Sequence, residues 1–208
     1  SINADLQPLN ILQKFKELNF QMYKSNATLT ATHPYSSKWY AWPLMIRPIY
    51  YWNGSAPPTG PGQASSPQVQ SRIYLLGNPA VWWASTLAVF YLAVTALALI
   101  LKALKNKTVL ILWRANNLPV FLLGSWIINL LPFVGISRAM FSYHYFPALI
   151  FAIISLAYLV GQLSPKNQKR AFVALITASV AALVFFAPLT YGLPLTESAY
   201  NWRIWLKS

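Results

Sequence analysis

Four apolar stretches constrain this chain more than any other feature of its sequence. The clearest covers residues 79–101, which contain no charged side chain and begin with Pro79. Because a helix rises 1.5 Å per residue, about 20 apolar residues cross the hydrocarbon core of a bilayer. Three further stretches are expected at residues 118–135, 143–162 and 171–191. The first of these three is short for a crossing on its own.

The composition supports a membrane protein. Hydrophobic residues make up 56% of the chain and charged residues only 9%, whereas a soluble domain has about 25% charged residues. A chain with so few charges cannot cover its surface with groups that water solvates. We therefore expect an all-α polytopic membrane protein with four transmembrane helices in residues 79–191.

The charge that is present is almost all positive. Lys and Arg number 16 against three acids, Asp5, Glu17 and Glu197, for a net charge of +13. The basic residues are scattered between apolar stretches and form no nucleic-acid-binding stripe. Membrane lipid is therefore the expected partner, and nucleic acid is not. With two histidines and no cysteine, the chain is expected to hold no metal.

The distribution of basic residues predicts how the helices are oriented. Residues 102–114 contain four of them and residues 164–170 contain three. Cytoplasmic loops of membrane proteins are enriched in Lys and Arg, so both connections are expected on the cytoplasmic side. Four crossings then place both termini, the segment before residue 79 and the turn at residues 138–145 on the outer face.

The segments outside the helical region differ in character. Residues 1–30 carry apolar side chains at helical spacing, which predicts an amphipathic helix on the membrane surface or, alternatively, one packed on the protein. Residues 31–78 are dense in Trp and Tyr, with three prolines before residue 49. They fit an aromatic loop at the lipid head groups followed by a β-hairpin from residues 47–52 and 72–76. Residues 192–208 form an outer-face tail.

Polar and cationic side chains gather on this predicted outer face. Arg and Lys donate the charge-assisted hydrogen bonds that hold a phosphate, so such a rim could bind the phosphate of a lipid whose tail lies between helices. An ordinary aromatic belt with cations extended toward the head groups is the alternative. The residues concerned are His33, Ser36, Ser37, Lys38, Arg47, Asn78, Arg138, Tyr143, His144 and Arg203.

Several short motifs, each weak alone, follow one another in the order found in one family. They are HPYSS at 33–37, WPL at 42–44, RPI at 47–49, LGNP at 76–79 with WW at 82–83, NLLPF at 129–133, YHYFPA at 143–148 and WR at 202–203. In this combination, over about residues 20–206, the chain resembles the protein O-mannosyltransferases. Its last residues resemble the tail of bacterial members.

The resemblance implies a fold and a reaction. Members of this family are membrane glycosyltransferases of the GT-C type, which transfer mannose from a polyprenyl-phosphate carrier to Ser or Thr of exported proteins. This chain would be the C-terminal four-helix portion, with polyprenyl-phosphate mannose as the expected donor and no certain cofactor. The family's catalytic acidic pair has no match, because Asp5 and Glu17 are not adjacent. Without a base to accept the hydroxyl proton, this chain alone is not expected to be active.

The resemblance also ranks the candidate residues, none of which is assigned to catalysis. Arg138 is the expected contact to the carrier phosphate, with a structural anchor as the alternative. For His144, a hydrogen-bonded structural role is the favoured interpretation. The residues expected to bind the lipid phosphate or to shape its cavity are Arg138, His33, Arg47, His144, Tyr143 and Ser37.

Two functions are therefore expected. The chain supplies the donor-side and structural part of a mannosyltransferase, with the N-terminal half of the enzyme or another membrane subunit as partner. Alternatively, it is a non-catalytic membrane scaffold derived from this family. The start at Ser1 rather than Met is expected of a processed product or of a piece of something longer. The tail and the short connection before Arg72 favour a bacterial plasma membrane over the endoplasmic reticulum.

Overall fold

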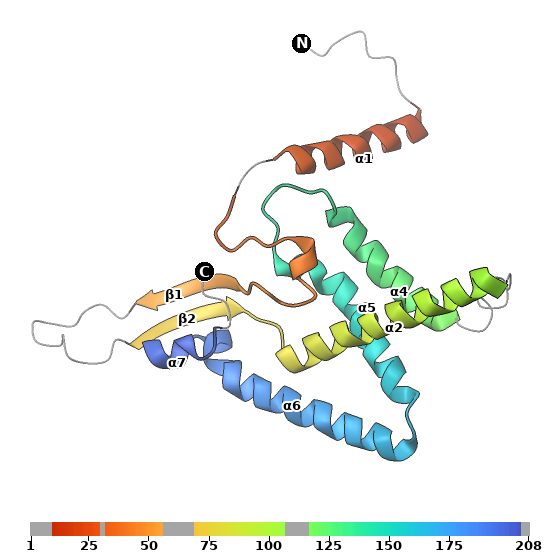
Figure 1. The fold of residues 1–208 in the computed structure, drawn as a ribbon. Coiled ribbons are helices and arrows are strands. Elements are labelled where there is room, and N and C mark those ends of the chain that lie inside the picture. Colours follow the sequence, from red (N-terminus) through yellow and green to blue (C-terminus); the bar gives the residue numbers. More distant parts are fainter. Residues whose placement is uncertain (1–9, 30–31, 56–68, 107–116, 205–208) are drawn as a thin grey trace, which may run out of the picture.

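The computed structural model describes residues 10–29, 32–55, 69–106 and 117–204. Helices dominate these residues, and one small sheet lies at one end of the molecule (Figure 1). Parts of four predicted segments lie outside the described residues. These parts are residues 1–9 of the N-terminal helix, most of the loop between the two strands, the end of the 102–114 connection and the last residues of the tail.

Three helices in the described part are long and apolar enough to cross a membrane. They are α2 (Pro79–Asn106), α5 (Phe146–Gly161, extended backward by a 3₁₀ turn from Ser142) and α6 (Pro165–Tyr191). A fourth apolar helix, α4 (Asn117–Leu130), is shorter and runs into the 3₁₀ turn Leu131–Phe133. The helical membrane fold predicted from the sequence is therefore confirmed, and the second predicted span is the short one.

Helix α6 begins six residues earlier than predicted, at Pro165 rather than residue 171. Ser164 has an extended backbone conformation and Pro165 occupies the first helical turn, where its missing N–H is not needed. The basic and amide side chains that follow favour helix as much as connection, because long unbranched residues lose little rotamer freedom in a helix. The prediction from the charged residues therefore placed the start of this helix too late.

The sheet contains the predicted hairpin and one further strand. Strands β1 (Ile49–Ser55) and β2 (Val69–Leu75) pair antiparallel, with an irregularity in register between Tyr50 and Trp52. A two-residue strand, β3 (Leu195–Thr196), pairs with the start of β2. Helix α7 (Glu197–Asn201) follows at once, with the Thr196 side chain as its N-cap. The C-terminal segment is thereby attached to the hairpin.

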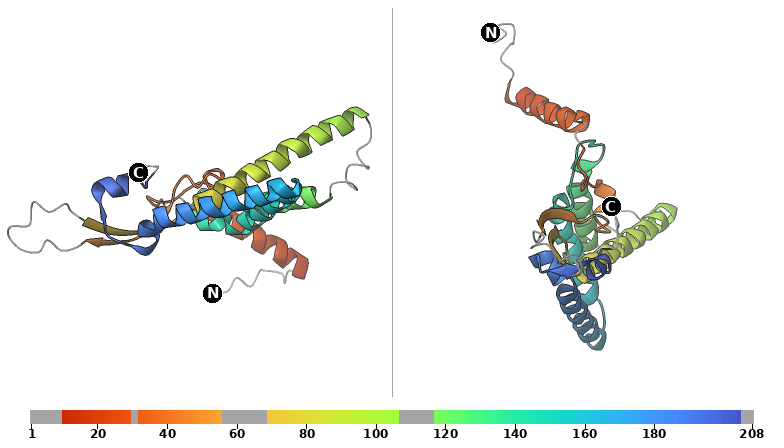
Figure 2. Two further views of the ribbon diagram at one scale, coloured as in Figure 1. Left: turned by 90° about the horizontal axis from the view of Figure 1, so that it is seen from below. Right: turned by 90° about the vertical axis from the view of Figure 1, so that its left-hand side faces the viewer.

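Helix α1 (Ile11–Thr28) lies to one side of the other helices (Figure 1), and one of its ends adjoins them in the left view of Figure 2. Asn10 and Gln13 close a reciprocal capping box at its start. None of its residues is buried, and apolar side chains such as Phe15 and Leu18 are exposed. The expected helix therefore forms, with the Tyr23 hydroxyl beside Gly135; its place on the membrane surface, or packed on protein, stays a prediction.

The core of the molecule lies where the start of α2, the end of α4 and the start of α5 meet the segment after residue 32. Large side chains from all four elements are buried together there. The cluster comprises Trp42, Met45, Trp82, Leu130, Ile136, Met140, Tyr145 and Ala148. Elsewhere the long helices expose many large apolar side chains, as helices surrounded by lipid do. The best-packed part of the chain thus lies at one end of the helices, at the two loops that carry the candidate residues.

Candidate functional site

Two loops far apart in the sequence form one surface. Loop A (residues 32–48) and loop B (residues 134–145) are joined by a hydrogen bond of 2.8 Å from the Ser37 amide to the Met140 carbonyl oxygen. The His33 ring meets the Phe141 ring edge to face, with centroids 5.1 Å apart. The predicted meeting of these two polar groups of residues is therefore observed.

Loop A is also attached to helix α2. The indole Nε1 of Trp82 donates a 2.8 Å hydrogen bond to the Trp42 carbonyl oxygen, and the Thr86 hydroxyl donates one of 2.6 Å to the Pro43 carbonyl oxygen. These donors belong to the first two turns of α2. The tryptophans that follow the LGNP motif thus satisfy backbone carbonyls of loop A, whose own regular structure is the single 3₁₀ turn Trp39–Ala41.

His144 is held on several sides by aromatic rings. Its ring stacks on Trp42, with centroids 5.7 Å apart, and on Tyr143, with centroids 4.4 Å apart, while Phe133 meets it edge to face. Its Nδ1 lies 2.9 Å from the Phe141 carbonyl oxygen. This packing fixes the orientation of the imidazole, as the structural interpretation of His144 requires, and leaves Tyr143 as the exposed side of the stack.

Ser37 and His33 both make contacts within loop A. The Ser37 hydroxyl accepts a 3.0 Å hydrogen bond from the Nε1 of Trp42, a side chain that is only 1% exposed. The Nδ1 of His33 accepts a 3.2 Å hydrogen bond from the Tyr35 amide. Both side chains therefore contribute to the shape of the loop, and His33 remains exposed to solvent or ligand.

Arg47 closes loop A on itself. Its Nη1 donates hydrogen bonds of 3.0 Å and 3.2 Å to the carbonyl oxygens of Pro34 and Ser36. A guanidinium carries five N–H donors, so these two contacts use only part of its capacity. Arg47 thus holds the turn at residues 33–37 in place from the far end of the loop.

Arg138 differs from the other candidates. Its side chain is half-buried in loop B, close enough to His144 for its charge to act on that ring. Within the described residues, its buried Nε has no hydrogen-bond partner. A buried donor left without a partner costs about 1–3 kcal/mol. The guanidinium also carries a positive charge, as a phosphate-binding residue requires.

Two members of the larger predicted set lie against helix α6 instead. Asn78 accepts from the Ala80 amide at the start of α2 and donates a 2.9 Å hydrogen bond to the Ser179 carbonyl oxygen. Arg203 donates hydrogen bonds to the carbonyl oxygens of Phe185 and Ala199. Both therefore serve to hold α2 and the C-terminal segment on α6.

The described acids lie outside loops A and B. Glu17 belongs to the exposed helix α1, and Glu197 begins α7; Asp5 lies outside the described residues. In the described part of the chain, no group of three or more His, Asp and Glu side chains could hold a metal. The described residues of loops A and B therefore present cationic, imidazole and aromatic side chains and no carboxylate.

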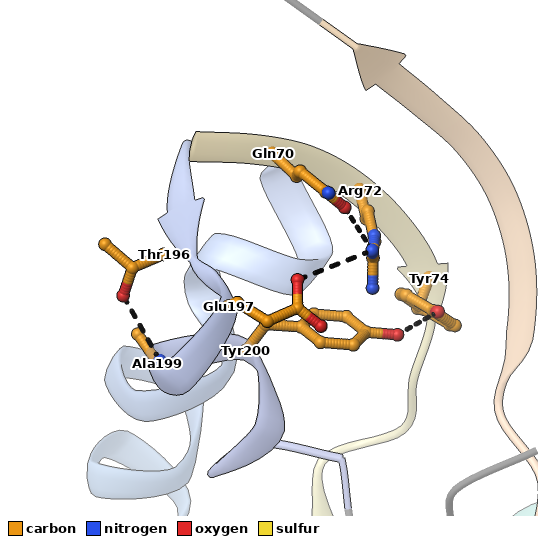
Figure 3. A network of polar contacts seen from close by, with 7 residues as sticks. All are labelled: Gln70, Arg72, Tyr74, Thr196, Glu197, Ala199 and Tyr200. Atoms are coloured by element: carbon orange, nitrogen blue, oxygen red, sulfur yellow. Dashed lines mark hydrogen bonds and ion pairs between the residues drawn. The ribbon is translucent and has the colours of Figure 1, made fainter. Parts of the chain in front are cut away.

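A second polar network lies on the sheet and was not predicted (Figure 3). The guanidinium of Arg72 lies 4.0 Å above the Tyr200 ring centroid, 4.0 Å from a Glu197 carboxylate oxygen, and in contact with Gln70. The hydroxyls of Tyr74 and Tyr200 share a hydrogen bond. A sequence signal existed for its C-terminal half, because Thr196 followed by Glu197 is a typical helix start.

This network changes the acidity of Tyr74. Burial raises the pKa of the Tyr74 phenol, and the hydrogen bond with Tyr200 raises it further. The nearby Arg72 cation opposes these effects only in part. Tyr74 therefore stays neutral and joins α7 to the hairpin, which is a structural task.

Comparison with known proteins agrees with the motif order. A sequence model described as the C-terminal four TMM region of protein-O-mannosyltransferase matches residues 11–208. Dolichyl-phosphate-mannose--protein mannosyltransferase 1 of Candida albicans is 31% identical over 92% of this chain and 22% of its own length. Protein O-mannosyl-transferase 1 of Homo sapiens is 27% identical over 88% of this chain and 24% of its own length.

A solved structure shares the fold. The Saccharomyces cerevisiae protein O-mannosyltransferase Pmt1-Pmt2 complex bound to the sugar donor superposes with a TM-score of 0.63 and 25% identity. The match covers 97% of this chain and 27% of the solved chain. This chain thus spans about a quarter of the length of these relatives. It belongs to the protein O-mannosyltransferase family and corresponds to its C-terminal four-helix membrane region.

Proposed function

We propose that this chain forms the donor-side wall of a membrane mannosyltransferase, with Arg138 against the phosphate of a lipid-linked mannose. The observation that carries this proposal is the position of Arg138, a half-buried cation on loop B close to His144, whose Nε donates no hydrogen bond among the described residues. Loops A and B supply the walls around it, because the Ser37–Met140 hydrogen bond fixes one against the other. Relatives named for dolichyl-phosphate-mannose support a lipid-linked donor of this kind.

The roles around Arg138 are divided between binding and shape. Exposed Tyr143 stacks on the Phe141 ring, and exposed His33 meets the same Phe141 ring edge to face from loop A, so both can contact the bound lipid. Ser37, Arg47 and His144 hold the loops in shape through the contacts described above. The carrier is a polyprenyl phosphate, whose tail would lie along the apolar faces of the neighbouring helices.

The base that accepts the proton of the acceptor hydroxyl comes from outside these residues. No acidic pair occurs in this sequence, and the two described acids lie elsewhere. The chain therefore acts together with an N-terminal half of the enzyme or with another membrane subunit. The complex named in the solved relative supports such a partner.

The charge distribution supports an outward-facing site. The basic C-terminal end of α2 and the basic start of α6 both lie at the end of the helices away from the sheet, at separate positions (Figures 1 and 2). With that end cytoplasmic, loops A and B and both termini face outward. The short connection between β1 and β2 and the C-terminal motif favour a bacterial plasma membrane.

Steady-state kinetics of the complete enzyme test the role of Arg138. If Arg138 holds the phosphate, Arg138→Ala raises the KM for lipid-linked mannose at least about tenfold, because a charge-assisted hydrogen bond is worth about 1.5–3 kcal/mol. Arg138→Lys keeps the charge and recovers part of the loss. Arg203→Lys, at a cation bonded to helix carbonyls, is the matched control and leaves KM unchanged. Unaltered KM and kcat in Arg138→Ala would contradict the assignment and favour a non-catalytic scaffold.

A further inference from the structure

The start of helix α6 carries two hollows that adjoin at Lys169. One, of about 520 Å³, lies between α5 and α6, which diverge from their shared corner near Ser164 (Figure 1). The other, of about 710 Å³, is a shallow depression along one face of α6. Lys169 lines both of them. The two hollows therefore share one cationic lining residue.

Apart from their basic residues, Gln168 and Thr177, the side chains that line the two hollows are apolar. The space between the helices is lined by branched and aromatic side chains from α5 and α6, among them Ile153, Leu156, Phe172 and Leu175. The depression on α6 is lined by small side chains, among them Ala174, Ala178 and Ala181. No acidic residue is among the described residues that line either hollow. Each hollow suits a hydrocarbon chain.

The mouth of the two hollows is strongly positive. Lys166, Lys169 and Arg170 all line the depression on α6, and all three are exposed. They occupy the first turns of α6, where Ser164 provides no side-chain cap and no acidic residue is present. The helix dipole adds to the positive potential at such an end. This position therefore attracts an anion at the boundary of an apolar span.

Helix α6 is also the least covered of the long helices. Only 6% of its most apolar window is buried, against 22% for the corresponding windows that contain α2 and α5. Within a bilayer such a surface is covered by lipid or by another helix. The three cations at its end favour lipid over another helix. A phospholipid supplies an anion and hydrocarbon together, whereas an apolar helix supplies no charge.

We propose that the corner between α5 and α6 binds a diacyl phospholipid with an anionic head group. Its phosphate lies against Lys166, Lys169 and Arg170, and its two acyl chains lie in the two adjoining hollows. Basic pockets at the ends of transmembrane helices bind anionic lipid head groups in this manner. This site lies at the opposite end of the helices from loops A and B and does not depend on the role of Arg138.

Lipid binding by the purified membrane protein tests the head-group assignment. Native mass spectrometry with added phosphatidylglycerol or phosphatidylcholine measures the two affinities. We expect phosphatidylglycerol to bind at least about tenfold more tightly, and Lys166→Gln/Lys169→Gln to weaken its binding about twenty-five-fold, from a factor of about five per cation. The control pair Lys102→Gln/Lys105→Gln removes the same charge from the end of α2 and changes the affinity about twofold or less. Equal affinities for the two lipids, or equal effects of the two variant pairs, would overturn the proposal.

Two further probes separate the possible occupants. Glycerol 3-phosphate and single-chain lysophosphatidylglycerol are expected to compete poorly with the diacyl lipid. Competition by glycerol 3-phosphate as strong as that of the lipid would show a site for free phosphate instead. A benzophenone amino acid at Ala178 is expected to form an adduct with lipid on illumination. An adduct with protein alone would show that a neighbouring helix fills the hollow.

Discussion

The amide of Ser37 donates a 2.8 Å hydrogen bond to the carbonyl oxygen of Met140, and this contact joins loop A to loop B. Met140 is itself in the buried cluster, two residues after Arg138. The position of Arg138 is therefore tied to loop A and, through Trp82, to helix α2. Substitutions in loop A should therefore shift Arg138 and weaken binding at the proposed phosphate position.

The first prediction concerns the acceptor for the buried Trp42 indole. Ser37→Ala removes the hydroxyl that accepts the hydrogen bond of the Trp42 Nε1, which would leave a buried donor unsatisfied at a cost of about 1–3 kcal/mol. In a Trp42→Phe background, which lacks that donor, the same change should cost little. Thermal unfolding of the four proteins in detergent measures the difference, and equal losses in both backgrounds would contradict the role of this hydrogen bond.

Gly77 is expected to tolerate no side chain. A Cβ at this position would lie 2.2 Å from Cε3 of the Trp82 indole, which is packed in the buried cluster. Gly77→Ala should therefore lower stability by about 1–3 kcal/mol through overpacking. Gly124, whose added Cβ would meet nothing within 4 Å, provides the control: Gly124→Ala should leave the melting temperature unchanged or slightly raised. Equal melting temperatures of the two variants would refute this packing argument.

Arg47 and Arg138 should differ in what they lose on truncation. Arg47 donates to two loop carbonyls, so Arg47→Ala should lower stability by about 1 kcal/mol and make loop A more susceptible to proteolysis. Arg138→Ala removes a buried N–H group that has no hydrogen-bond partner among the described residues. In the absence of lipid-linked mannose, this substitution should leave stability unchanged or raise it slightly. Limited proteolysis and thermal unfolding distinguish the two. A destabilised Arg138→Ala protein would indicate a structural anchor.

The Tyr74–Tyr200 contact predicts a loss of stability at alkaline pH. Burial and the hydrogen bond raise the pKa of Tyr74 in the folded state, whereas an unfolded tyrosine has a pKa of about 10. Above about pH 10 the folded protein keeps a proton on Tyr74 that the unfolded chain releases. The contribution of Tyr74 to the free energy of unfolding is therefore constant below about pH 10 and falls above it. Tyr74→Phe should show a shallower fall. Melting temperatures across this range test the point, and parallel curves would contradict it.

The sequence predicted the parts of the fold that depend on local pattern. Residues 79–101 were recognisable because an uncharged apolar run of that length has few alternatives. The hairpin was recognisable from β-branched and aromatic residues on both sides of a segment rich in Gly, Pro and Ser. The start of α6 was placed too late, because Lys166, Lys169 and Arg170 carry a charge signal for a connection and an equally good propensity for helix.

Contacts between distant residues could not be predicted in the same way. Periodicity places Ser37 and Met140 in loops but says nothing of the hydrogen bond between them. The sequence also could not show which cations bind a ligand and which hold the structure, because Arg47, Arg138 and Arg203 look alike in sequence. Only the coordinates show that Arg47 and Arg203 donate to backbone carbonyls while the Nε of Arg138 has no partner in the described part of the chain.

Photo-crosslinking of the donor is the most direct measurement of the proposed phosphate wall. A lipid-linked mannose with a photoreactive group on the first isoprene unit next to the phosphate is bound to the complete enzyme, illuminated and mapped by peptide mass spectrometry. If loops A and B hold the phosphate, labelled residues fall within 33–47 and 137–146, and Arg138→Ala reduces this labelling. Labelling that misses both loops, or is indifferent to Arg138→Ala, would contradict the assignment.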